Sequence, residues 1–252
     1  MDRFLATLTF FTRLPLWRWK EIPADSYKRV VELWPLAGWL TGLLTAAVLL
    51  CCSMILPPLP SVMIAFAIRA VFTGALHEDG LADFFDGFGG GTSRQRILEI
   101  MKDSHIGTYG VIGILFYYLL IIGVLSELPP YIAALVILTG DPWSKCCAAQ
   151  IINFLPYART AQQAKNKTVY TRMSPLALIG CAILGAAPLV AVACFCNFGF
   201  LYTAAAAPVL VSAGLILYFR HKIQGYTGDC CGATALLSEL SFCITTLALC
   251  LR

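Results

Sequence analysis

The sequence predicts an all-α fold: a polytopic integral membrane bundle of about seven transmembrane helices, with an N-terminal amphipathic helix and further helices in cytoplasmic loops. Three observations predict this class. Hydrophobic residues make up 59% of the 252 residues and charged residues only 13%, a balance typical of membrane proteins. Seven apolar segments each approach the ~20 residues that a helix needs to cross a bilayer. Lys and Arg are concentrated in alternate loops between these segments.

The first 15 residues predict a short amphipathic helix. Phe4, Leu8 and Phe11 fall on one helical face of this segment. A signal peptide would need a longer apolar core and a small-residue cleavage site, and neither is present. We therefore expect a helix that lies at the membrane surface. Residues 16–35 combine charges with Trp and Tyr, which is typical of the headgroup level.

The predicted spans follow in order. They cover residues 36–56, 60–77, 107–125, 131–154, 175–196, 199–219 and 233–251. Four ionisable residues lie inside them, namely Arg69, Asp141, Lys145 and Glu239. Because such groups are costly in a bilayer, we expect them to be paired or functional. A salt bridge is favoured for Asp141, with Arg69 as a candidate partner.

The distribution of positive charge predicts the orientation. Fifteen of the 18 Lys and Arg residues lie in the N-terminal segment and in the loops 78–106, 155–174 and 220–232, and the intervening loops contain none. By the positive-inside rule these segments are cytoplasmic, and the C-terminus is outside if there are seven spans. We therefore expect a protein of the bacterial or archaeal cytoplasmic membrane, surrounded by the lipid bilayer.

The basic residues, the cysteines and the absence of linkers exclude several other kinds of protein. The sequence has no run of Lys or Arg of the kind that binds nucleic acid, so no nucleic-acid partner is expected. The 11 cysteines include no C-x-x-C spacing and most lie in apolar segments, so we interpret them as small hydrophobic residues. No repeat or linker divides the chain, and residues 1–252 are expected to form one domain.

The densest polar segment, residues 77–87 (HEDGLADFFDG), predicts a metal site. Asp79, Asp83 and Asp86 are spaced i, i+4, i+7, which on a helix places them within roughly 60° of arc. Like charges this close repel unless a cation lies between them, and carboxylate oxygens are preferred ligands of Mg²⁺ or Mn²⁺. The alternative is a solvated acidic helix end. His77 is a candidate proton acceptor.

A glycine-rich loop at residues 87–91 leads into a predicted helix that begins with Arg94 and Arg96. Free backbone N–H groups and arginines at a helix start can bind phosphate, and a flexible connector is the equal alternative. Beyond this helix, Ser104 joins the candidate phosphate-binding residues. Asp103 is either a further metal ligand or the partner of a nearby base.

The last long loop carries Asp229, which could bring a carboxylate to the same pole as the acidic segment. Clustered carboxylates, arginines and a glycine loop at the cytoplasmic face of a membrane protein suggest Mg²⁺-dependent phosphoryl transfer. In that chemistry the metal bridges phosphate oxygens and offsets charge on the leaving group. The catalytic motifs are therefore expected at about residues 74–110 and 225–240.

Five segments carry a resemblance to a known family. In chain order they are FFTRLP (10–15), WPLAGWLTG (34–42), GALHEDGLADFFDG (74–87), RILEIMKDSHIGTYG (96–110) and GYTGDCCGATALLSEL (225–240). With these motifs the chain resembles the cobalamin synthase family, the adenosylcobinamide-GDP ribazoletransferases. The resemblance extends along nearly the whole chain, and its HxDGLADxxDG core is highly specific.

The resemblance implies a reaction. A member of this family would join adenosylcobinamide-GDP, a corrinoid nucleotide, to α-ribazole or α-ribazole 5′-phosphate and release GMP with the help of Mg²⁺. The resemblance also implies that Asp79, Asp83 and Asp86 hold the metal, with Asp103 and Asp229 as additional ligands. Whether the chain forms a homo-oligomer or a complex with other cobalamin-assembly enzymes stays open.

The resemblance assigns the remaining site residues as well. It implies that Arg94 or Arg96 contacts the pyrophosphate of the corrinoid nucleotide. It also implies that His77 or one of the carboxylates accepts the proton of the attacking hydroxyl group.

Two other functions are kept as alternatives. A CDP-alcohol phosphotransferase also has a D-x-x-D-G motif, which residues 83–87 match, but the two aspartates that continue its motif are absent. An ion-coupled transporter would use Asp141, Lys145 and Glu239 along a pathway through the membrane. Such a transporter would predict inverted repeats, and the sequence shows none.

Overall fold

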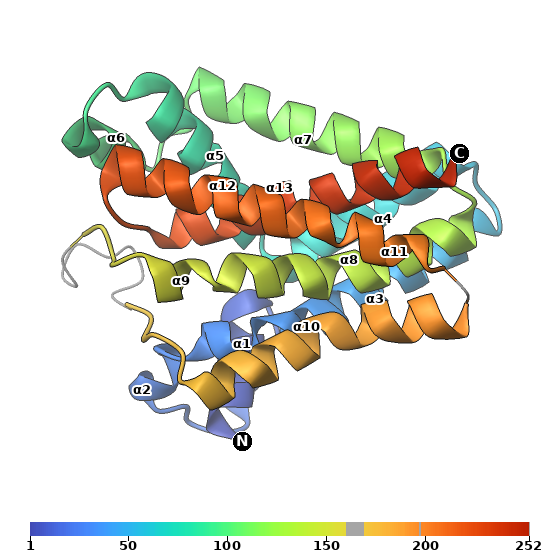
Figure 1. Ribbon diagram of the computed structural model, residues 1–252, viewed down its shortest axis with the longest axis horizontal. Helices are drawn as coiled ribbons and strands as arrows, with labels where there is room; N and C mark the ends of the chain where they lie inside the picture. The colour runs from blue at the N-terminus through green and yellow to red at the C-terminus, as the bar shows by residue number, and fades with distance from the viewer. Residues whose placement is uncertain (160–168, 197, 252) are drawn as a thin grey trace.

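The computed structural model describes residues 1–159, 169–196 and 198–251, and this part of the chain is helical (Figure 1). The elements are α1 (Asp2–Phe11), η1 (Leu16–Arg18), α2 (Ala24–Tyr27), η2 (Val30–Leu33), α3 (Trp34–Ser53), α4 (Pro58–Thr73), α5 (Leu76–Gly90), α6 (Arg94–Ile100), α7 (Thr108–Ser126), α8 (Pro130–Ala149), α9 (Ile151–Phe154), α10 (Pro175–Phe195), α11 (Phe200–Ala204), α12 (Ala206–Ile223) and α13 (Gly228–Cys250). The predicted all-α class is confirmed.

Within the described residues, five helical segments are long and apolar enough to cross a membrane. They are Val30–Ser53, Thr108–Ser126, Pro175–Phe195, Phe200–Ile223 and Gly228–Cys250. A sixth results if α4 and α5, which meet at 92°, are one broken span. A polytopic helical membrane protein is thus confirmed, while the predicted count of about seven falls to five or six. Helix α8 is missing from either count, because Asp141 and Lys145 interrupt its apolar sequence, and the 16-residue α4 is counted only together with α5.

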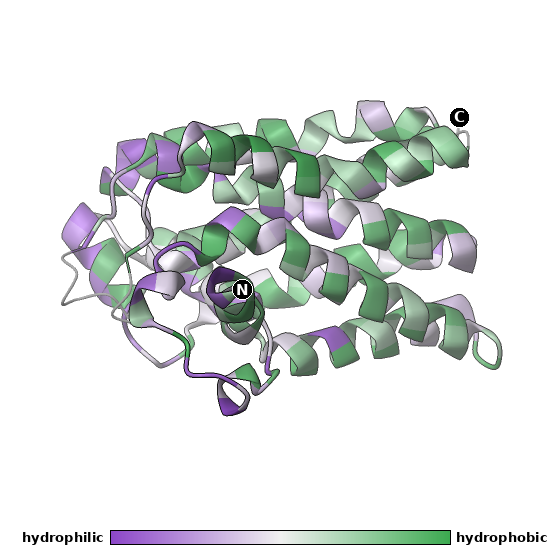
Figure 2. Cartoon of the chain, turned by 90° about the horizontal axis from the view of Figure 1, so that it is seen from below, coloured by the Kyte–Doolittle hydropathy of each residue, from purple (hydrophilic) through white to green (hydrophobic). Residues whose placement is uncertain are grey.

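Most of the short helices and the longer connections lie at one end of the bundle, which we call the polar end (Figure 1). Figure 1 shows α2, α6 and α9 at this end and the C-terminus at the opposite end. In Figure 2 the hydrophilic residues are concentrated at the polar end, whereas the long helices are mainly hydrophobic. A bundle that spans a membrane requires this separation, because its apolar lengths face lipid and its loops face water.

Helices α3 and α8 pack closely because α3 presents two glycines to α8. A Cβ atom at Gly38 would lie 2.8 Å from the Cα atom of Pro142, and one at Gly42 would lie 3.3 Å from the carbonyl oxygen of Ile137. Small residues four positions apart allow helix backbones to approach within a membrane. The glycine pair therefore fixes the central helix pair of the bundle.

Four charged side chains in the interior form two ion pairs. Lys145 pairs with Asp141 one turn earlier on α8, and Thr41 of α3 donates to the same carboxylate at 2.5 Å. Arg69 of α4 pairs instead with Glu239 of α13, with an Nη1–Oε1 distance of 2.5 Å. The expected salt bridge of Asp141 is present, but the suggested partner Arg69 was wrong. The i, i+4 spacing on one helix places Lys145 nearer.

The acidic segment forms a helix after a sharp break in the chain. Gly74 (φ 70°) ends α4 in the left-handed conformation, and Ala75 (φ 55°) continues it. Glycine adopts this conformation readily, whereas alanine does so at a cost. The segment was expected to lie in the cytoplasmic loop 78–106, but α5 packs against α7 and α13 and most of its residues are buried. The reason is that small and aromatic residues alternate with its carboxylates and give α5 apolar surface to bury.

Candidate functional site

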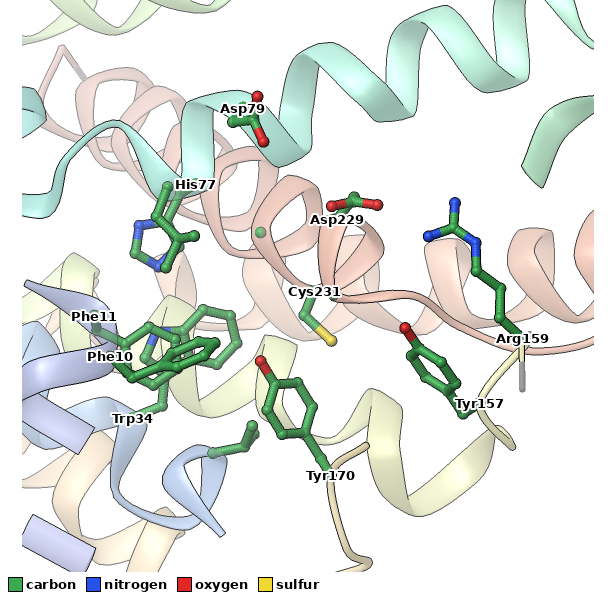
Figure 3. Close-up of a pocket in the computed structure, with 14 residues that line it drawn as sticks. Phe10, Phe11, Trp34, His77, Asp79, Tyr157, Arg159, Tyr170, Asp229 and Cys231 are labelled. Carbon is green, nitrogen blue, oxygen red and sulfur yellow. The ribbon is translucent and has the colours of Figure 1, made fainter. Parts of the chain in front are cut away.

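A pocket at the polar end is formed by α1, η2, α3, α5 and α13 together with the segments around Tyr157 and Tyr170. It encloses about 800 Å³ of space, counting its open mouth. Figure 3 shows that its charged and aromatic side chains lie on different sides. The charged side has Asp79, Arg159 and Asp229, and the opposite side has Phe10, Phe11 and Trp34. The pocket therefore has one side suited to phosphate or metal and one suited to a flat apolar group.

Glycines bring the two acidic elements of the pocket together. A Cβ atom at Gly80 of α5 would lie 3.0 Å from the carbonyl oxygen of Asp229, and one at Gly232 of α13 would lie 3.3 Å from the Cα atom of His77. The backbones of α5 and α13 are therefore in direct contact. As a result, Asp79 and Asp229 line the same pocket although 150 positions separate them in the sequence.

Asp86 lies away from this pocket and caps α7. Its Oδ2 atom accepts the backbone N–H of Gly107 at 2.6 Å, and its Oδ1 atom accepts that of Gly110 at 2.8 Å. These N–H groups belong to the first turn of α7, where no helical acceptor exists. A carboxylate at this position also interacts favourably with the helix dipole. Asp86 thus acts as the capping side chain of α7, because the N-cap residue Gly107 has no side chain of its own.

The three aspartates of the acidic segment consequently have different surroundings. Asp79 is exposed at the pocket, while Asp83 and Asp86 are only 9% and 8% exposed. Among the described residues no group of three or more His, Cys, Asp and Glu side chains is arranged to hold a metal ion. The pocket carboxylates Asp79 and Asp229 nevertheless fit Mg²⁺, which is commonly held by one or two carboxylates with waters and substrate phosphates.

The arginines predicted to bind phosphate are engaged elsewhere. Arg94 donates to the carbonyl oxygen of Ile223 at 2.8 Å and to that of Ala158 at 2.7 Å, and so ties α6 to the end of α12. Arg96 is exposed and lies 3.4 Å from Glu99. Neither arginine lines the pocket.

Arg159 is the arginine that lines the pocket, and the sequence analysis missed it. Its Nη2 atom donates to the carbonyl oxygen of Leu98 at 3.0 Å, which holds the half-buried side chain against α6. The available signal was its position directly after the fourth predicted span, next to Tyr157. The sequence alone did not distinguish Arg159 from the other Lys and Arg residues of the loop 155–174.

Asp103 and Ser104 lie in the exposed turn between α6 and α7, and neither lines the pocket. Asp103 accepts hydrogen bonds from the backbone and the ring Nδ1 atom of His105, at 3.0 and 2.7 Å. These hydrogen bonds lower the pKa of the Asp103 carboxyl group below its ordinary value. Of the two readings for Asp103, the structure shows the pairing with a neighbouring base.

His77 is a buried member of an aromatic stack at the pocket wall. Its ring centroid lies 5.9 Å from that of Phe11 and 5.6 Å from that of Trp34, and the rings are parallel within 12°. Phe11 and Trp34 stack on each other at 5.0 Å. Within the described residues, His77 Nε2 and Trp34 Nε1 are buried without hydrogen-bond partners. Such unpaired buried polar atoms are costly unless a partner reaches them.

Tyr157 and Tyr170 also line the pocket. Burial raises the pKa of Tyr157 and raises the pKa of Tyr170 well above the ordinary value. Both phenol groups are therefore neutral at physiological pH and can donate hydrogen bonds to an anionic ligand. Together with Arg159 they give the pocket hydrogen-bond donors in addition to its carboxylates.

Comparison with known proteins decides the family. The profile of the family CobS, cobalamin-5-phosphate synthase, matches residues 3–247. The chain belongs to the cobalamin-5-phosphate synthase family. The match includes the pocket residues from α1, α5 and α13, so the resemblance stated from the sequence motifs is confirmed.

Members of the cobalamin-5-phosphate synthase family from Shewanella are among its similar relatives. The adenosylcobinamide-GDP ribazoletransferase of Shewanella sp. (strain W3-18-1) is 35% identical over 248 residues, covering 95% of this chain and 91% of the relative. That of Shewanella woodyi is 37% identical over 241 residues, covering 94% and 92%. No solved structure matches the chain.

Membership in the cobalamin-5-phosphate synthase family leaves no support for the alternative of a CDP-alcohol phosphotransferase. The structure also weakens the alternative of a transporter, because its three intramembrane charges are occupied. Asp141 and Lys145 pair with each other, and Glu239 pairs with Arg69.

Proposed function

We propose that this protein catalyses the reaction for which its relatives are named, the transfer of ribazole to adenosylcobinamide-GDP. The 3′-hydroxyl oxygen of α-ribazole, or of its 5′-phosphate, attacks the phosphorus atom next to the cobinamide. The bond from this phosphorus to the oxygen of GMP breaks, and GMP leaves with the bonding electrons. The hydroxyl proton passes to a pocket carboxylate or to His77, whose ring borders the same pocket.

The observation that carries this proposal is the meeting of Asp79, Asp229 and Arg159 in one pocket. Phosphoryl transfer depends mainly on positioning and on electrostatic stabilisation of phosphate oxygens. Arg159 is suited to the pyrophosphate because its guanidinium group can form two parallel hydrogen bonds with phosphate. Tyr157 supplies a further neutral donor to the same anion.

Asp79 and Asp229 are the residues we assign to Mg²⁺, with Mn²⁺ as the alternative ion. When bound, the ion would neutralise charge on the pyrophosphate and on departing GMP. Asp83 lies one turn after Asp79 on α5 and is kept as a candidate ligand. Asp86 and Asp103 are not assigned to the metal, because their carboxylates accept the hydrogen bonds described above.

We propose further that the polar end is cytoplasmic. The loops that contain most of the Lys and Arg residues lie at this end, and the positive-inside rule places such loops in the cytoplasm. The C-terminus, at the opposite end of the bundle, would then be outside. This orientation exposes the pocket to soluble nucleotides.

The test is release of GMP by detergent-purified protein supplied with adenosylcobinamide-GDP, α-ribazole and Mg²⁺. We expect release that requires both substrates, is abolished by a chelator, and needs a higher Mg²⁺ concentration in Asp229→Asn. Asp25→Asn is the matched control, because Asp25 is an exposed carboxylate that does not line the pocket and pairs with Lys28. A well-folded protein that releases no GMP would refute the proposal.

A further inference from the structure

Apart from His77, which is one candidate acceptor of the hydroxyl proton, the aromatic side of the pocket has no part in the phosphate chemistry described above. It is built from Phe10 and Phe11 of α1, Trp34 at the start of α3, His77 of α5, and Tyr170, whose ring meets that of Phe10 (Figure 3). We call these five residues the aromatic wall. They come from four segments of the chain, so the fold has to assemble the wall from separate parts.

The geometry of the aromatic wall is ordered. Phe11, Trp34 and His77 have parallel rings within 12° and mutual centroid distances of 5.0 to 5.9 Å. Phe10 meets Phe11 edge to face at 5.0 Å and meets Tyr170 in the same way at 6.1 Å. Phe11, Trp34 and His77 are buried, so the half-buried rings of Phe10 and Tyr170 offer most of the surface on which a flat aromatic ligand could stack.

Two features of the wall indicate a ligand and not only packing. The wall borders a cavity with an open mouth, whereas a cluster needed only for stability can be closed over by side chains. It also contains the ring nitrogens of Trp34 and His77, which are buried without hydrogen-bond partners among the described residues. A flat ring with a polar nitrogen at its edge offers partners for such groups.

We infer that the aromatic wall is the subsite for the planar base of the nucleoside acceptor, the base of α-ribazole. This inference rests on the proposed function and extends it. With the base against the wall, the ribose reaches toward Asp79 and Asp229 on the charged side of the same pocket. The bulky corrinoid then remains at the mouth, and its pyrophosphate enters beside Arg159.

Guanine of the other substrate is also a flat base, but the wall suits it less. The neighbours of the wall at the pocket lining include Val31 and Leu76, which cannot hydrogen-bond. Within the described residues, an edge there can therefore pair only with the two ring nitrogens of Trp34 and His77. Guanine carries several donors and acceptors on its edges and would leave most of them unpaired there. A base with few polar edge groups fits this surrounding better.

Kinetics with each substrate varied separately test the inference. Phe10→Leu and Tyr170→Leu remove one ring each from half-buried positions. We expect each to raise KM for α-ribazole about tenfold, since stacking of a base on an aromatic side chain contributes at this scale. KM for adenosylcobinamide-GDP should stay near the wild-type value. Phe4→Leu is the matched control, because Phe4 lies on α1 but outside this pocket, and it should change neither constant.

A binding measurement separates this inference from the proposed function. Equilibrium dialysis of α-ribazole alone, without Mg²⁺ or corrinoid, should show binding to the wild type and weakened binding to Phe10→Leu and Tyr170→Leu. Unchanged KM for α-ribazole in both variants of an active enzyme would overturn the inference and leave the proposed function intact. So would a selective rise in KM for adenosylcobinamide-GDP, which would assign the wall to guanine. Absence of GMP release by the wild type would refute the proposed function itself.

Discussion

Arg69 and Glu239 form an ion pair at 2.5 Å in the interior of the bundle, between α4 and α13. The two side chains are 4% and 3% exposed. Tyr117 of α7 receives a second hydrogen bond from Arg69 at 3.1 Å, so the pair connects three helices. The buried ion pair therefore holds α13, which carries the pocket residue Asp229, against α4 and α7.

The Arg69–Glu239 ion pair gives the first prediction. Glu239→Gln leaves the Arg69 guanidinium buried beside a neutral partner, and we expect the free energy of unfolding to fall by about 3–5 kcal/mol. Denaturation in detergent, followed by circular dichroism, measures the change. Glu127→Gln, at an exposed position after α7, is the control and should have little effect. Equal stability of the two variants would contradict the structural role of the pair.

The second prediction concerns Asp86 and distinguishes a role as the cap of α7 from a role as a metal ligand. Asp86→Ala should destabilise the protein by about 1–2 kcal/mol through loss of the α7 cap, and Asp86→Asn, which keeps one acceptor oxygen, should lose less. The Mg²⁺ concentration for half-maximal activity should not change in Asp86→Asn. If that concentration rises as much as in Asp229→Asn, Asp86 is a metal ligand after all.

The pocket carboxylates give the third prediction. Asp79→Asn and Asp229→Asn should each raise the Mg²⁺ requirement by at least about tenfold, because even residues that only support a metal ligand have effects of that size. Titration of activity with Mg²⁺ measures the requirement, and thermal unfolding confirms that the variants are folded. A normal Mg²⁺ requirement in both variants would remove the metal from this pocket.

Arg159 gives the fourth prediction. Arg159→Met should raise KM for adenosylcobinamide-GDP by roughly 10- to 100-fold, the scale of a lost hydrogen bond to a charged group. Arg96→Met, at an exposed position outside the pocket, should leave KM nearly unchanged. The reverse result would restore the phosphate-binding role that the sequence suggested for Arg96.

The contact between α5 and α13 gives the fifth prediction. A methyl group at Gly80 would lie 3.0 Å from the carbonyl oxygen of Asp229, so Gly80→Ala should force the helices apart. We expect a loss of about 1–3 kcal/mol in stability and a larger loss of activity. Gly123→Ala is the control, because open space surrounds Gly123 on α7. Full activity of Gly80→Ala would show that the close approach does not position the carboxylates.

Much of the fold could be predicted because it follows from composition along the chain. Apolar segments of membrane-spanning length predicted helices, and the loops rich in Lys and Arg lie together at the polar end. The break before α5 could not be predicted, because Ala75 adopts a left-handed conformation that alanine rarely takes. Tertiary packing of α5 imposes that conformation, and nothing in the local sequence signals it.

The site was predicted in part for a similar reason. Spacing on one helix identified Asp79, and the second motif identified Asp229, but spacing also grouped Asp86 with them. The structure directs Asp86 to α7 because the first turn of α7 needs an acceptor. Arg159 could not be distinguished from other loop cations, since only the folded chain brings it to the pocket.

The 92° turn from α4 into α5 bears on whether ions could cross the membrane along the acidic residues of α5. If α4 crosses the bilayer, a helix at 92° to it runs nearly parallel to the bilayer plane. The acidic residues of α5 then lie at about one depth, close to the water, instead of marking a path through the hydrocarbon. Chemistry on highly charged nucleotides can proceed in such a membrane protein without opening a conduit for protons or ions.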